Sequence, residues 1–158
     1  MYKRQHLATG RPNDPQKKER YLSKYLDIPN EPLYPFGYGL SYTGFTISDV
    51  ILSSDRLTEN GEITASVCIQ NTGEREGSDV LQLYIRDVTA SVARPVKELK
   101  GIEKVSLKPG EKKEIGFRIT EEMLRFVRAD GSYGSEPGKF RVWISDSSDS
   151  GVYQEFIL

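Results

Sequence analysis

Short runs of alternating apolar and polar residues begin at Phe45 and continue to the end of the chain. The clearest covers 63–70, where every second residue from Ile63 to Ile69 is apolar. A period of two is typical of strands that bury one face. Similar runs, bounded by turn residues, predict strands over 45–52, 80–88, 99–107, 112–120, 126–128, 139–145 and 152–158.

Three of these runs carry further detail. In 45–52 the apolar positions shift out of phase, which predicts a bulge near Asp49. After 112–120, the acidic residues behind Thr120 predict one helical turn over 120–123, with Thr120 as its N-cap. In 80–88 we expect Leu81, Leu83 and Ile85 to face the core, with Gln82, Tyr84 and Arg86 on the opposite face.

Seven to eight short strands at regular turn spacing, with almost no helix, indicate an all-β fold. The prediction is an antiparallel β-sandwich of the fibronectin type III or immunoglobulin-like class, with an extended N-terminal arm. Residues 44–158 would form this domain, which is close to the usual size of about 100 residues. A domain of that size needs no disulfide or metal for stability.

The first 35 residues have a different texture, with five prolines and few aliphatic side chains. This proline spacing forbids a long helix. Two interpretations stay open for the segment 16–26. One is a short helix capped by Asp14, and the other is an extended arm.

The segment 31–43 joins the arm to the sandwich and holds four aromatic residues, two prolines and two glycines. It has neither a helical nor a strand period. We interpret it as a stiff, shaped connector that presents rings to a neighbouring surface. The alternative is that these rings cover the open end of the chain's own sandwich.

Charge and composition exclude several classes of protein. The 158 residues have a net charge of −1, from 22 basic and 23 acidic side chains, which argues against nucleic acid or an anionic membrane as partner. No apolar run approaches the ~20 residues of a membrane span. No signal peptide is visible, so the chain is either cytoplasmic or a piece whose export signal lies upstream.

The residue types that perform chemistry are sparse and scattered. The only histidine is His6 in the arm, and the only cysteine is Cys68 among neutral neighbours in a predicted strand. No cluster of ligands suits zinc, and the turn that holds Asp146 and Asp149 lacks the ligand density of a calcium loop. We therefore predict no metal, no cofactor and no catalytic residue.

Paired carboxylates of the kind that cleave glycosidic bonds are not evident either. None of the candidates sits in a sequence setting that would raise its pKa by burial. The candidates by count are Asp79, Glu98, Glu103 and Asp130.

Several motifs, in order, resemble one known family. The sequence from Pro35 to Thr43, Pro-Phe-Gly-Tyr-Gly-Leu-Ser-Tyr-Thr, resembles the linker that opens the C-terminal fibronectin type III-like domain of glycoside hydrolase family 3. Further matching elements follow in the expected order, namely Asn71-Thr-Gly73 with Gly77, Leu81-Gln-Leu-Tyr84, Arg94-Pro-Val-Lys-Glu-Leu-Lys-Gly101, Leu107-Lys-Pro-Gly-Glu111 and Pro137-Gly-Lys-Phe140. Upstream, Thr9-Gly-Arg-Pro12 resembles the exit from the preceding α/β domain.

The resemblance covers 6–158 and implies a division of the chain. Residues 1–5 would be a non-native scar, 6–43 an interdomain linker and 44–158 the domain. The parent would be a retaining β-glucosidase or β-xylosidase, exported or periplasmic. Its catalytic carboxylates would lie on upstream domains, so none is carried onto this chain, which would be a non-catalytic accessory domain.

Two sets of side chains are candidates for binding. The first would dock on the upstream catalytic domains and consists of Tyr34, Phe36, Tyr38, Tyr42 and Arg94. The second belongs to the alternative of a stand-alone carbohydrate- or partner-binding module. In that hypothesis Trp143 and Tyr84, with Tyr153, form an exposed aromatic row for a β-glycan, unless Trp143 packs on a neighbouring strand or on the arm.

Overall fold

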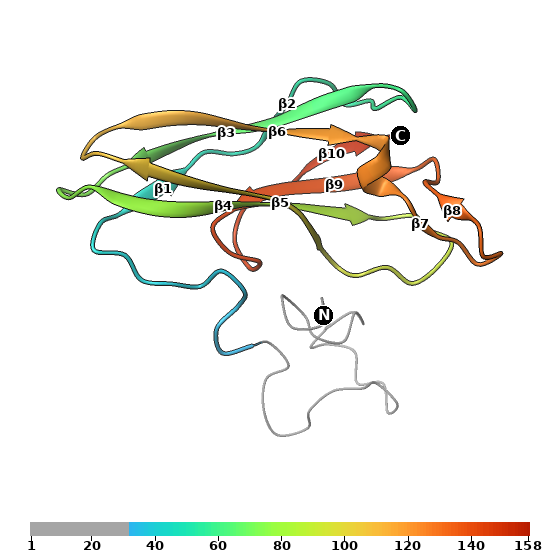
Figure 1. The fold of residues 1–158 in the computed structure, drawn as a ribbon, viewed down its shortest axis with the longest axis horizontal. Coiled ribbons are helices and arrows are strands. Elements are labelled where there is room, and N and C mark those ends of the chain that lie inside the picture. The colour runs from blue at the N-terminus through green and yellow to red at the C-terminus, as the bar shows by residue number, and fades with distance from the viewer. Residues whose placement is uncertain (1–31) are drawn as a thin grey trace.

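The computed structural model describes residues 32–158 and contains two antiparallel β-sheets packed face to face (Figure 1). In the first sheet, β3 (Glu62–Asn71) is central: it pairs with β6 (Lys112–Thr120) and with the short strands β1 (Phe45–Ile47) and β2 (Ile51–Leu52). The second sheet has the order β10 (Gln154–Ile157), β9 (Lys139–Ser145), β4 (Gly77–Asp87) and β5 (Glu98–Leu107). The predicted all-β sandwich is confirmed.

The predictions that fall on residues 1–31 lie outside the described residues. They comprise the scar at 1–5, the alternatives for 16–26 and the motif Thr9-Gly-Arg-Pro12. The boundary predicted at residue 44 stays a prediction, although the first strand begins at Phe45.

The core between the sheets consists of the side chains that the alternation predicted. Ile63, Ala65, Val67 and Ile69 from β3 are each at most 2% exposed. From the facing sheet, Leu81, Leu83 and Ile85 of β4 pack against Phe140, Val142 and Ile144 of β9 in the same cluster. Burial of these side chains is the main force that holds the sheets together.

The predicted bulge near Asp49 is confirmed by the strand register. Ile47 pairs with Ile69, while Ile51 pairs with Ser66, so the first strand gains one residue between these pairs. The hydroxyl of Ser48 fills the break in the ladder by accepting a hydrogen bond from Cys68 N at 2.9 Å. The slip keeps Val50 buried while Ile51 faces solvent.

A single 3₁₀ turn, Glu121–Leu124, occupies the place of the predicted helical turn. Thr120 is at the N-cap, but its side chain makes no capping hydrogen bond, so that part of the prediction is wrong. Glu121 instead turns toward Arg125, whose Nε donates to Oε2 at 2.8 Å. The hydrogen bond from Arg125 is the largest of several causes that lower the pKa of Glu121, and a hydrogen bond from Ser135 is the next.

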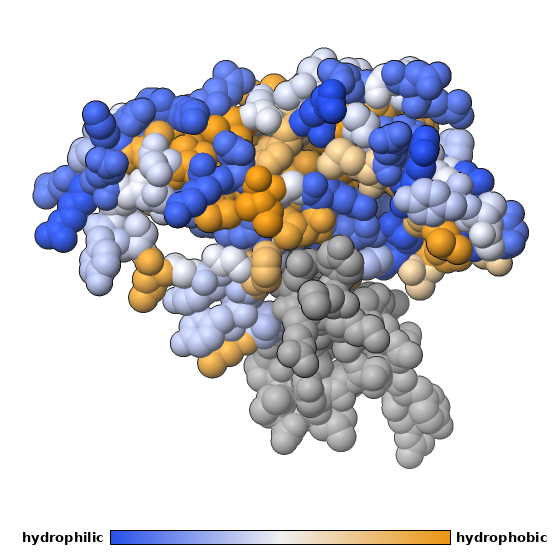
Figure 2. Space-filling model, viewed as in Figure 1, coloured by the Kyte–Doolittle hydropathy of each residue, from blue (hydrophilic) through white to orange (hydrophobic). Residues whose placement is uncertain are grey.

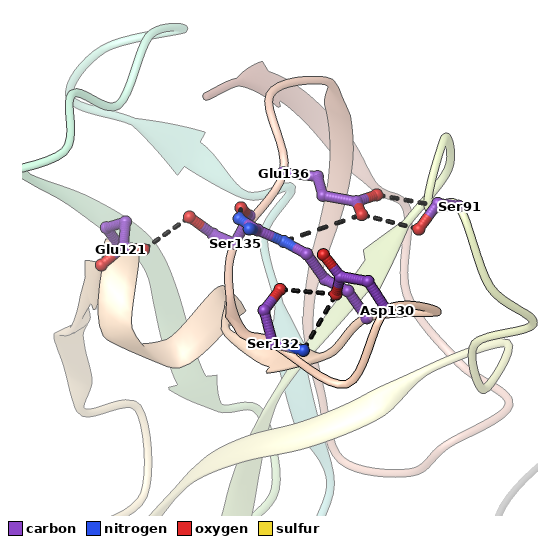
Figure 3. Close-up of polar contacts among 7 residues, drawn as sticks. Ser91, Glu121, Asp130, Ser132, Ser135 and Glu136 are labelled. Carbon is purple, nitrogen blue, oxygen red and sulfur yellow. Dashed lines mark hydrogen bonds and ion pairs between the residues drawn. The ribbon is translucent and has the colours of Figure 1, made fainter.

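A small hairpin of β7 (Phe126–Val127) and β8 (Tyr133–Gly134) follows this turn. Strands this short are marginal alone, and polar contacts hold them in place (Figure 3). Ser135 donates to Glu121, while Glu136 accepts from both the backbone N and the hydroxyl of Ser91, at 2.9 and 2.6 Å. The hairpin is thereby attached to the 3₁₀ turn and to the β4–β5 connection.

Candidate interaction site

Residues 33–42, which we call the hook, leave the sandwich before β1 and bend back at a tight turn. Tyr38 N donates to the Pro35 carbonyl at 3.0 Å, and Gly37 has a φ of +89°. A positive φ at the third position defines a type II turn and favours glycine there. A Cβ at position 37 would also come 2.5 Å from the Asp146 carbonyl oxygen, so a side chain is excluded by space as well.

The turn of the hook rests on the loop that follows β9, residues 146–151, which we call the seat loop. The Phe36 carbonyl accepts a hydrogen bond from Ser148 N at 2.8 Å, and Ser148 is fully buried. The seat loop is in turn held by Gln82 on β4, whose Nε2 donates to the Asp146 carbonyl at 2.7 Å. The backbone at the turn of the hook is therefore held by hydrogen bonds to the seat loop.

The large side chains of the hook are mostly exposed. Tyr34, Phe36 and Tyr38 are 63%, 45% and 53% exposed, and Tyr42 is 94% exposed. Leu33 and Leu40 are at least as open as the first three. Figure 2 shows the segment standing away from the body of the molecule, with hydrophobic side chains at its surface. At the positions of Leu40 and Tyr42 the hook does not cover the end of its own sandwich.

The other end of the hook is anchored by Asn71, a residue that sequence reasoning treated only as part of a loop motif. Its side chain is fully buried and accepts from Thr43 Oγ1 at 2.7 Å and from Gly73 N at 3.0 Å. It also donates to the carbonyls of Arg75 and Leu107, at 2.7 and 3.0 Å. The motif Asn71-Thr-Gly73 was the only sequence signal of this anchor.

The predicted exposed row of aromatics on the second sheet is wrong. Tyr84 is fully buried and Trp143 is 7% exposed, so neither ring offers a face to a sugar. Both side chains do point away from the core, as alternation requires, but the chain itself covers them. Lys97 from the β4–β5 connection lies with its Nζ 4.7 Å from the Trp143 ring centre, and the Tyr153 ring lies 5.4 Å from it.

Lys97 joins this covered aromatic layer to the hook. Its Nζ donates to the Ser148 carbonyl at 2.9 Å, on the same residue whose N–H holds Phe36. Burial lowers the pKa of Lys97 to about 8, while the nearby Asp149 opposes the shift. The rings of Tyr84 and Trp143 therefore pack under Lys97, which holds the seat loop, and they do not form a binding surface.

Arg94, expected among the docking side chains, is turned into the molecule. Its guanidinium lies 4.4 Å from the centre of the Phe126 ring and pairs with Glu98. Glu98 also pairs with Lys100 at 2.7 Å. The side chain of Arg94 is only 18% exposed, and it attaches the β4–β5 connection to the β7–β8 hairpin. Its role in docking stays a prediction.

Among the four candidate carboxylates of the sequence analysis, Asp79 departs from the expectation that burial raises none of their pKa values. Asp79 lies half-buried beside the hook, and burial raises its pKa, with a smaller contribution from the charge of Asp146. Within residues 32–158, no three side chains of the metal-binding types are placed to hold a metal ion. Within the same residues, no helix is long and apolar enough to cross a membrane.

The fold and these contacts define a fibronectin type III-like β-sandwich. The family model for the "Fibronectin type III-like domain" matches residues 79–148. The chain is 57% identical over 143 residues to the periplasmic β-glucosidase of Salmonella typhimurium, which covers 90% of this chain. It is 42% identical over 117 residues to a β-xylosidase of Formosa agariphila, covering 75% of this chain.

Solved structures agree with these relatives. The β-glucosidase of Listeria innocua in complex with isofagomine superposes with a TM-score of 0.86 at 44% identity, over 98% of this chain and 22% of that one. The β-glucosidase of Kluyveromyces marxianus superposes with a TM-score of 0.69 at 40% identity, over 79% of this chain and 15% of that one. The chain belongs to the fibronectin type III-like domains of glycoside hydrolase family 3.

The match covers most of this chain but only a small part of each relative. The chain spans 19% of the Salmonella relative and 16% of the Formosa relative, so it corresponds to about a fifth of each enzyme or less.

Proposed function

We propose that the chain is a non-catalytic accessory domain of a β-glycosidase and that the hook docks it against the upstream catalytic part of the enzyme. The parent activity would be hydrolysis of terminal β-D-glycosides, by a β-glucosidase or β-xylosidase in the periplasm or outside the cell. The relatives that carry these names support this proposal.

The observation that carries it is the contrast within the hook. Its backbone is fixed at both ends, by Ser148 and by Asn71, while Leu40 and Tyr42 are more than nine-tenths exposed. Large exposed aromatic and apolar side chains on an ordered backbone are typical of an interface. A fixed backbone also lowers the entropy lost on docking.

The alternative of a stand-alone sugar-binding module loses its main support, because the rings of Tyr84 and Trp143 are covered. In the described part of the chain, the remaining exposed rings lie mainly on the hook, whose Tyr34 and Tyr38 stack tilted at 4.8 Å. Titration with short β-glucans, followed by Trp143 fluorescence, should give no saturable signal.

The docking hypothesis is testable in an intact enzyme. We would replace the matching part of the Salmonella β-glucosidase with this chain and compare hydrogen exchange of the hook in the chimera and in the isolated chain. We expect the hook amides to be strongly protected only in the chimera. Equal exchange in both proteins would refute docking.

The non-catalytic assignment has its own measurement. The isolated chain should not hydrolyse an aryl β-glucoside, whereas the chimera should. Turnover that stays with the isolated chain after repurification would overturn the assignment.

A further inference from the structure

A hollow of about 380 Å³ lies between the hook and the edge of the sandwich, and we call it the basin. It lies where β4 continues beyond the last residue that pairs with β9, at Gln82 and Ser145. Tyr38, Leu40 and Phe45 contribute apolar surface to it, while Asp79 and Asp146 contribute carboxylates. A second hollow of about 350 Å³, beside Phe36 and Ile102, is lined by the same two aspartates.

Neither aspartate has a cationic partner in residues 32–158. The Asp79 carboxylate accepts a hydrogen bond from Val80 N at 2.8 Å, and Asp146 accepts one from the Ser150 hydroxyl. No ion pair reaches either side chain within this range. Asp146 is exposed, but its charge adds to the raised pKa of the half-buried Asp79. Two neighbouring negative charges of this kind are unfavourable without a positive one.

Two other partly buried carboxylates of the described chain, those of Glu98 and Glu155, are neutralised by cations. Glu98 pairs with Arg94 and Lys100, and Glu155 pairs with Lys139 and Arg141. Asp79 differs from them in facing a hollow beside the exposed hook, and the raised pKa of its carboxyl is the electrostatic consequence. The missing cation is thus expected on whatever covers the hook.

We propose that the basin accepts one arginine side chain from the upstream catalytic part of the enzyme, with its guanidinium between Asp79 and Asp146 and its stem against Tyr38 and Leu40. This inference rests on the proposed docking function. The guanidinium is planar and carries five donors, so one side chain serves two carboxylates and stacks on a ring as well. A lysine ammonium, as a compact and strongly hydrated charge, fits an aromatic and apolar wall less well.

The basin would therefore add a polar contact to a docking surface that is otherwise apolar, and this contact would fix how the two parts align. Rings of the hook supply contact area, which is tolerant of small shifts. A pair of carboxylates that faces one guanidinium fixes position and orientation, because its hydrogen bonds are directional.

The test uses the chimera with the Salmonella enzyme and the double variant Asp79→Asn, Asp146→Asn. Asparagine keeps one oxygen that can accept from Val80 N or from Ser150, and it replaces the charged carboxylate by a neutral amide of similar size. We expect the midpoint of urea unfolding of the isolated chain to stay the same or to rise, because the variant removes two unpaired negative charges from the folded state. In the chimera, hydrogen exchange of the hook should become about fivefold faster, as expected for an ion pair worth about 1 kcal/mol.

Salt and a matched variant sharpen the result. Exchange of the hook in the wild-type chimera should speed up at high salt, and the double variant should lose this salt dependence. The control is Glu114→Gln on the outer face of β6, which should change nothing in either protein, because its side chain is exposed on the other sheet.

The two proposals fail in different ways. If the hook of the wild-type chimera is as open to exchange as that of the isolated chain, docking itself is wrong and the basin proposal falls with it. If the hook is protected but the double variant exchanges at the wild-type rate with unchanged salt dependence, docking stands and the arginine site is wrong.

Discussion

Two groups of aromatic side chains meet at the seat loop, and they differ in what covers them. Tyr84 and Trp143 are buried under Lys97, although their strands point them away from the core. Tyr38 and Tyr42 of the hook lie open. Ser148 connects the groups, since it accepts from Lys97 and donates to Phe36. The difference separates a structural layer from an exposed surface for which we propose a docking partner.

The structural layer behaves as a second, smaller core on the outer face of the β10–β9–β4–β5 sheet. Loops of the same chain cover its rings, and the partly buried cation of Lys97 lies among them. The hook has no such cover from residues 32–158, so its apolar area contributes to stability only when something else buries it.

The largest expected effect is on the covered layer. Trp143→Ala should lower the free energy of unfolding by about 3 kcal/mol or more, because truncating a buried aromatic leaves a cavity. Urea unfolding followed by circular dichroism measures it, with Tyr153→Ala as a milder control at a half-exposed ring. A loss below about 1 kcal/mol would mean that the layer is not a second core.

The anchor of the hook gives the next effect. Asn71→Ala should cost about 2 kcal/mol, because the Leu107 and Arg75 carbonyls and Gly73 N lose their partner in a buried place. The matched control is Gln70→Ala, one residue earlier on the same strand and not buried. Similar unfolding midpoints for the two variants would show that Asn71 is not the anchor.

Titration of the covered layer gives a smaller effect with a defined sign. The pKa of Lys97 is about 8 when folded against 10.5 ordinarily, so between these values the unfolded chain binds more protons and stability rises with pH. After solvent screening the rise should be roughly 1 kcal/mol. Unfolding by urea at several pH values measures it, and Lys97→Met should abolish it.

Ionisation of Tyr84, in the same layer, changes stability with pH in the opposite direction. Burial raises its pKa to about 12 from 10, so above pH 10 the unfolded chain loses its proton first and stability falls. Tyr84→Phe should remove this fall while leaving the rise due to Lys97. A fall that persists in the variant would assign it to another tyrosine.

The smallest expected effect is on the hook of the isolated chain. Tyr42→Ala should change the free energy of unfolding by less than about 0.5 kcal/mol, because the side chain is 94% exposed. In the chimera the same substitution should increase hydrogen exchange of the hook. An equal loss in both proteins would mean that Tyr42 stabilises the sandwich rather than an interface.

Local pattern was sufficient wherever one side of a strand meets the core. The inward set on β3 and the bulge near Asp49 follow from alternation and from its single slip. Alternation also placed Tyr84 and Trp143 on the outer face correctly. It could not show that the segment before β5 and the seat loop return over that face, because a loop's path depends on contacts far apart in the sequence.

Contacts far apart in the sequence also decide where the side chains of Arg94 and Asn71 lie. Both lie in motifs that were recognised in the sequence, but neither position alone tells which way the side chain turns. Arg94 meets Phe126 across more than thirty residues of chain, and Asn71 meets Leu107 in the same manner. Such pairings appear only when segments far apart in the sequence come together in the fold.

The sequence by itself determined the strands, the sandwich and the aromatic composition of the hook, because period and turn chemistry are properties of neighbouring residues. Tertiary structure decided which aromatic side chains are covered and which are exposed. It also brought Asp79, near the start of β4, and Asp146, just after the end of β9, to one basin, because the antiparallel pairing places these two ends side by side. Exposure and charge proximity depend on the whole fold, and no local pattern contains them.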